Sequence, residues 1–229
     1  PRPAAPLPPR PPERPGALRP TAPGRYSFDE SGFSRTRGCV VSERPVPSPT
    51  SLVVEPPDGV RQRSVRDRRS SDGQGSITSA VLEYRADGIY LASLRQSQTT
   101  ILGSFEVAFE PSPPPLALPA RPEAGQRWSY TATSTDGKVT VRVDNVMEAL
   151  DEVVTLGDGT PSGALRLLAT THTTGVTPQG SLDLTETSRV RVSVERRMIL
   201  REISDSKGRI GLCQLESHVE TLLRSTTPR

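Results

Sequence analysis

Apolar and polar residues alternate along much of this chain, and the alternating runs are separated by short turn-forming pairs. Val139, Val141 and Val143 are each followed by a polar residue, a pattern that buries one face of a strand and leaves the other in water. The same period of two recurs over residues 182–195. Stretches with helical periodicity are scarce, so the sequence predicts an all-β fold.

The dipeptide Asp-Gly marks the places where the chain turns back. It occurs at 58–59, 72–73, 87–88, 136–137 and 158–159. Glycine in this position tolerates the positive φ angles of tight hairpin turns. We therefore expect a mostly antiparallel meander, and a curved half-barrel sheet is one form that such a meander takes.

Two proline-rich segments divide the chain. Residues 1–24 lack a hydrophobic period and are predicted to be a disordered, extended tether. Residues 111–124 interrupt the folded part, because proline donates no hydrogen bond within a sheet. Whether the halves on either side share one core is left open. The expected organisation is a tether (1–24), an N-terminal β half (25–110), a connector (111–124) and a C-terminal β half (125–226).

The charge and the hydropathy of the chain limit the kinds of partner and the location that we expect for it. With 29 basic against 26 acidic residues the net charge is +3, too balanced for nucleic acid to be the expected partner. No stretch approaches the roughly 18 consecutive apolar residues of a membrane-spanning helix. The sequence begins with Pro1, so we expect that an upstream segment was removed, and a signal peptide or a lipid anchor fits that place. The predicted location is extracellular or associated with the cell envelope.

Two cysteines, Cys39 and Cys213, lie near opposite ends of the folded region. In an oxidising compartment they would form a disulfide that joins the first strands to the last. The alternative is two separate buried thiols, and the distance between them in the sequence does not decide between the two.

The sequence contains no recognisable set of catalytic residues. The Gly-x-Ser-x-Gly elbow of hydrolases and the Walker-type phosphate loop are absent. His172 and His218 are expected on the polar side of strands, as surface residues. Cys213 and His218 would point to opposite faces of one strand, which disfavours a zinc site. We predict a protein without catalytic residues, metal or cofactor.

The densest group of charges is a run of arginines between residues 61 and 69. Asp-Gly pairs flank it on both sides, so it is predicted to be a mobile, solvated loop. The functional alternative is contact with an anionic lipid head group, a wall polymer or a phosphate backbone. The candidates for such a contact are Arg61, Arg63, Arg66, Arg68 and Arg69.

Several stretches resemble uncharacterised secreted or cell-envelope proteins of actinobacteria. They are the proline-rich tether, Gly-Gln-Arg-Trp-Ser-Tyr at 125–130, and a strand, turn and strand over 189–204 that is followed by Gly-Arg-Ile-Gly-Leu at 208–212. More distantly, the long antiparallel strands resemble the half-barrel lipoprotein carriers and the related mycobacterial envelope lipoproteins, which cup an acyl chain in a curved sheet. Those carriers usually contain helices that plug the sheet, and this sequence barely offers them.

Two functions remain open from the sequence. The first is a secreted or surface-tethered binding module, because curved sheets commonly enclose pockets for apolar or lipidic ligands. The second is a structural or protein-interaction domain with a packed core, whose partner would be an envelope protein. For the first function, the predicted ligand-binding residues are Trp128, Tyr130, Val141, Leu167 and Val192.

Overall fold

The computed structural model describes residues 19–39, 41–100, 103–193 and 195–229, so most of the predicted tether lies outside the described residues. Within the described ranges, every regular element is a β-strand and all strand pairs are antiparallel, which confirms the predicted all-β meander. The strands are β1 (Gly24–Arg37), β2 (Ser42–Pro45), β3 (Thr50–Val54), β4 (Arg61–Arg69), β5 (Gly75–Tyr84), β6 (Gly88–Thr100), β7 (Gly103–Phe109), β8 (Leu116–Pro119), β9 (Arg127–Thr133), β10 (Val139–Thr155), β11 (Pro161–Thr177), β12 (Gly180–Ser193), β13 (Ile199–Ile210) and β14 (Cys213–Leu223).

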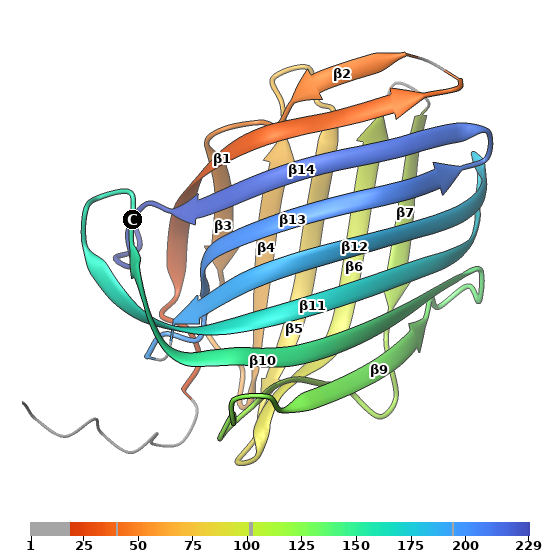
Figure 1. Cartoon of the computed structure of the whole chain (residues 1–229). Helices are drawn as coiled ribbons and strands as arrows, with labels where there is room; N and C mark the ends of the chain where they lie inside the picture. Colours follow the sequence, from red (N-terminus) through yellow and green to blue (C-terminus); the bar gives the residue numbers. More distant parts are fainter. Residues whose placement is uncertain (1–18, 40, 101–102, 194) are drawn as a thin grey trace, which may run out of the picture.

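A single sheet connects all of these strands. Its hydrogen-bonded path runs β7-β6-β5-β4-β3-β1-β14-β13-β12-β11-β10-β9, while β2 pairs with β1 and β8 pairs with β6. In Figure 1, β10–β14 lie in front of β3–β7 and cross them at a steep angle. Strand β1 links the two layers, because its first part pairs with β3 and its later part with β14. The sheet is thus curled into a nearly closed, barrel-like shape.

The Asp-Gly pairs do connect neighbouring strands, as expected. Four of them lie between β3 and β4, β4 and β5, β9 and β10, and β10 and β11. In the fifth, Asp87 precedes β6 and Gly88 is its first residue, without a positive φ. Gly59, Gly73, Gly137 and Gly159 have φ angles between 57° and 83°, the region that glycine adopts without steric cost.

The arginine-rich run is not a loop. Residues 61–69 form strand β4, paired with β3 on one side and β5 on the other, so the prediction of a mobile, solvated segment was wrong. The reason is alternation: Arg66 and Arg68 point into the molecule while Arg61, Arg63 and Arg69 point outward, and each arginine finds a carboxylate.

The apolar core consists of three clusters between the layers. In the first, Tyr26 and Phe28 pack with Leu200 and Leu223. The second joins Tyr84 and Ile89 to Met147, Leu165 and their neighbours, and the third lies around Phe109, Val139 and Leu182. Residues from both sides of the proline-rich connector contribute to each cluster.

Candidate functional site

A group of four charged side chains crosses the interior between the layers. The Glu30 carboxylate, on a side chain only 1% exposed, accepts hydrogen bonds from Arg66 Nη2 (2.7 Å) and Arg68 Nε (3.0 Å). Glu202 lies 3.3 Å from Arg68 Nη2 and 3.9 Å from Arg66 Nη1. Thr50 Oγ1 donates a further bond of 2.8 Å to Glu30. Two arginines and two glutamates therefore form this group, and the charge of Glu186 also acts on Arg68.

The arginines of this group differ in their surroundings. Burial lowers the pKa of Arg66, the charge of Arg68 lowers it further, and its guanidinium lies 4.4 Å from the centre of the Phe28 ring. Burial also lowers the pKa of Arg68, but the carboxylates of Glu30 and Glu202 outweigh that effect and raise it. Arg66 Nε is buried and has no hydrogen-bond partner among the described residues.

A cavity of about 260 Å³ lies beside this group, inside the curled sheet. Its walls come from β1, β3, β4, β5 and the turn that leads from β12 to β13. Most of the lining surface is carbon, and none of the described residues that line it is acidic. The lining residues are Thr21, Phe28, Leu52, Val54, Gln62, Ser64, Arg66, Thr78, Ala80, Leu82, Tyr84, Arg197, Met198 and Ile199.

The segment before β1 crosses one end of this cavity. The backbone N–H of Thr21 donates to Gln62 Oε1 (2.9 Å), and Gln62 Nε2 donates back to the Thr21 carbonyl (2.7 Å). Thr21 Oγ1 donates to the carbonyl of Arg196 (3.0 Å) in the β12–β13 turn. These bonds hold β4, the N-terminal segment and the turn together around the cavity.

The five predicted ligand-binding residues do not line this cavity. Leu167 and Val192 are buried in the second cluster, against which Trp128 packs, and Val141 packs against the third. Tyr130 lies opposite Val143, and burial raises the pKa of its phenol. The lining residues Ala80, Leu82 and Met198 were missed by the sequence reasoning. The alternation of Thr78, Ala80 and Leu82 was a usable signal for β5, whereas Met198 lies in a turn without periodicity.

The outward-facing arginines of β4 are engaged in ion pairs. Arg61 Nε lies 3.3 Å from Glu83, and Arg63 Nη1 lies 3.2 Å from Glu55. Arg69 pairs with Asp67 at 2.6 Å. Contact with an anionic partner stays a prediction for these residues.

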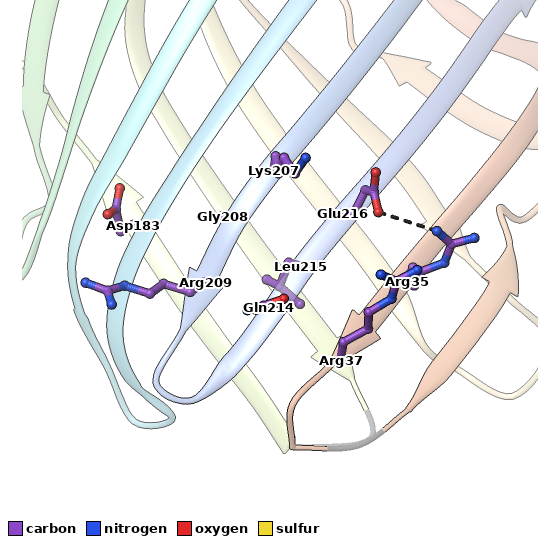
Figure 2. Close-up of a pocket in the computed structure, with 9 residues that line it drawn as sticks. All are labelled: Arg35, Arg37, Asp183, Lys207, Gly208, Arg209, Gln214, Leu215 and Glu216. Atoms are coloured by element: carbon purple, nitrogen blue, oxygen red, sulfur yellow. Dashed lines mark hydrogen bonds and ion pairs between the residues drawn. The ribbon is translucent and has the colours of Figure 1, made fainter.

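Figure 2 shows a second hollow, on the outer face where β1, β13 and β14 approach their turns. Arg35 Nη1 lies 3.5 Å from Glu216 there, and its Nη2 lies 2.7 Å from Glu43. Arg37, Lys207 and Arg209 have no ion-pair partner among the described residues. The hollow carries both signs of charge and is open to solvent.

The histidines lie on the outer surface. His172 Nδ1 is 3.1 Å from Thr185 Oγ1, and His218 Nδ1 is 2.8 Å from Asp205 Oδ1. The described residues do not combine a nucleophile, a base and an orienting carboxylate at either place. Nor does the described part of the chain contain a group of three or more His, Cys, Asp or Glu residues that could hold a metal ion. In the same part, no helix is long and apolar enough to cross a membrane.

Cys39 and Cys213 form a disulfide in the structure, with their Cα atoms 5.0 Å apart. The bond links residues separated by 174 positions and joins the β1–β2 connection to the start of β14. The two cysteines are therefore joined by a disulfide between the first and last strands and are not separate buried thiols.

No protein-family model and no curated protein matches this sequence. Among solved structures, the chain is similar to a candidate lipoprotein from Parabacteroides distasonis, at 10% identity, with 90% of this chain and 96% of that chain covered and a TM-score of 0.42. It is also similar to the hypothetical lipoprotein YmcC from Escherichia coli, at 11% identity, with coverage of 86% and 88% and a TM-score of 0.30. The resemblance to actinobacterial proteins stays a prediction.

Proposed function

We propose that this chain is a non-catalytic binding module that holds an apolar or lipidic ligand in the cavity inside its sheet. The supporting observation is the carbon-rich cavity of about 260 Å³. Ligand sites are typically apolar pockets with a few polar groups, of roughly 300–1,000 Å³ for drug-sized molecules. The cavity is slightly smaller, so it suits a single short chain or one segment of a longer chain.

The proposed location is extracellular or at the cell envelope. The disulfide between Cys39 and Cys213 supports it, because such bonds persist in oxidising compartments and are rare in the cytosol. Its partners would then be envelope lipids or envelope proteins.

Native mass spectrometry tests the binding proposal on the whole chain with its disulfide formed. We expect an additional mass under native conditions that denaturation releases, and an acyl species in a lipid extract of the purified protein. Ala80→Leu places a larger side chain in the cavity and is expected to remove the additional mass. Val81→Leu, the outward-facing neighbour on the same strand, is the control and is expected to retain it.

The second candidate is a structural or protein-interaction domain. It is favoured by the packing elsewhere in the interior, where three apolar clusters and the Glu30 ion pairs occupy the space between the layers. A bare mass in the native spectrum, unchanged after incubation with envelope lipids, would refute the binding proposal and favour this domain. Cross-linking to envelope proteins would then identify its partners.

A further inference from the structure

Arg197 is a cation without a counterion at the wall of the cavity. It lies in the β12–β13 turn, is half-buried, and lines the cavity together with Met198 and Ile199. Its guanidinium has no hydrogen bond or ion pair to any of the described residues, and burial lowers its pKa. None of its guanidinium nitrogens is completely buried, so they remain accessible to a ligand.

The two arginines that line the cavity differ in whether they have a counterion. Arg66, the other cation of the lining, is compensated by Glu30 at 2.7 Å. Glu30 and Glu202 pair with Arg66 and Arg68, and the charge of Glu186 also acts on Arg68. Among the described residues, no carboxylate forms an ion pair with Arg197. Of the lining residues that the structure describes, Arg197 is thus the cation without an ion pair, and a ligand with one negative charge would complement it.

We infer that the ligand is a single-chain anionic amphiphile, whose carboxylate is bound by Arg197 and whose chain lies along the apolar wall. This inference rests on the proposed function. Thr78, Ala80, Leu82 and Tyr84, alternate residues of β5, line the cavity, so this wall is about 20 Å long at the usual rise of a strand. A medium-chain fatty acid fits within that length.

The geometry of a guanidinium suits this role. Its N–H groups form a planar fork that matches the two oxygens of a carboxylate. Hydrogen bonds to a charged group contribute more than neutral ones, and a partly water-excluded site strengthens them. An uncharged chain of the same length would fill the apolar wall equally but would leave Arg197 without a partner.

Isothermal titration of the whole chain with decanoate and with decanol tests the inference, at a mildly alkaline pH where decanoate is ionised. We expect the wild type to bind decanoate at least about tenfold more tightly than decanol. Arg197→Gly is expected to abolish this preference, because decanoate then loses its cationic partner. Arg197→Lys, which keeps the charge but not the fork, is expected to retain part of it.

Glycine is the suitable replacement because Arg197 has a φ of 54°, a conformation that glycine adopts without strain. The variant is thus expected to fold with unchanged or higher thermal stability. Arg189→Gln is the matched control, since Arg189 is an exposed arginine on β12 that does not line the cavity. It is expected to keep the preference for decanoate.

The outcomes separate the two proposals. Equal affinity of the wild type for decanoate and decanol would overturn the anionic ligand and leave the apolar site standing. Binding of neither probe would contradict the proposed function itself. A preference for decanoate that survives in Arg197→Gly would show that another group binds the carboxylate, and the assignment to Arg197 would be wrong.

Discussion

Glu30 carries the more buried of the two carboxylates that pair with Arg66 and Arg68. Its carboxylate bonds to Arg66 and Arg68 at 2.7 and 3.0 Å. Removing one partner of a buried ion pair typically costs about 3–5 kcal/mol, because the remaining charge stays buried without compensation. We expect Glu30→Gln to lower the free energy of unfolding by about that amount in urea titrations.

The neighbouring residue is the control for this substitution. Asp29 pairs with Arg224 on the surface at 2.6 Å, with both side chains nearly half exposed. Exposed ion pairs contribute about 0–1 kcal/mol, so Asp29→Asn should have little effect on the free energy of unfolding. Equal losses of the free energy of unfolding in the two variants would contradict a larger contribution of the buried ion pairs of Glu30.

Asp136 links stability to pH at the turn between β9 and β10. Its pKa is lowered by hydrogen bonds from Ser134 Oγ (2.6 Å) and from the backbone N–H of Lys138 (3.1 Å). Because the folded pKa lies below the unfolded value of about 3.9, the contribution is fully present above that value and is lost as the pH falls through the folded pKa. We expect the melting temperature of Asp136→Asn to lie below that of the wild type near neutral pH, with the difference shrinking in acid. A constant difference at all pH values would argue against this linkage.

At the Asp-Gly turns, the backbone conformation depends on the turn residues themselves rather than on distant contacts. Gly137 has a φ of 74° and open space around its Cα, so a methyl group there meets no neighbour but forces a left-handed conformation. Gly137→Ala is expected to cost about 1 kcal/mol. Gly163, in β11, also has open space but no positive φ, so Gly163→Ala should be neutral or slightly stabilising. Chemical denaturation of both variants checks the difference, and equal effects would contradict it.

At the same scale, local alternation predicted strands β10 and β12. The alternation of valines in β10 and the turn at Asp136-Gly137 are properties of adjacent residues, so the sequence alone reveals them. In β4, charge density obscured the period of two, although Arg66 and Arg68 followed it. Their partners Glu30 and Glu202 are distant in sequence, and only the curled sheet brings them together.

The disulfide contributes to the stability of the whole molecule. It closes a loop of 174 residues, and removal of a native disulfide typically costs about 2–5 kcal/mol. We expect the double substitution Cys39→Ser and Cys213→Ser to lower the melting temperature measurably. Addition of a reductant should lower it in the wild type and leave it unchanged in the double variant. A wild type insensitive to a reductant that demonstrably cleaves the bond would contradict this contribution.

The cavity also belongs to the whole molecule. Residues as far apart as Phe28, Ala80 and Met198 line it, and they meet because β1 passes from one layer to the other. The sequence predicted Trp128 and Leu167 as ligand-binding residues, but Leu167 is buried in the second cluster and Trp128 packs against it. Alternation alone could not show which wall of the curled sheet leaves space.

The two methionines of the chain allow the most direct measurement of ligand binding. Met198 lines the cavity, whereas Met147 is fully buried in the second cluster and serves as an internal reference. In methyl NMR spectra of methionine-labelled protein titrated with decanoate, we predict that the Met198 signal shifts and shows contacts to the chain protons of the ligand, while the Met147 signal moves little. Saturable binding without any change at Met198 would contradict an interior ligand site.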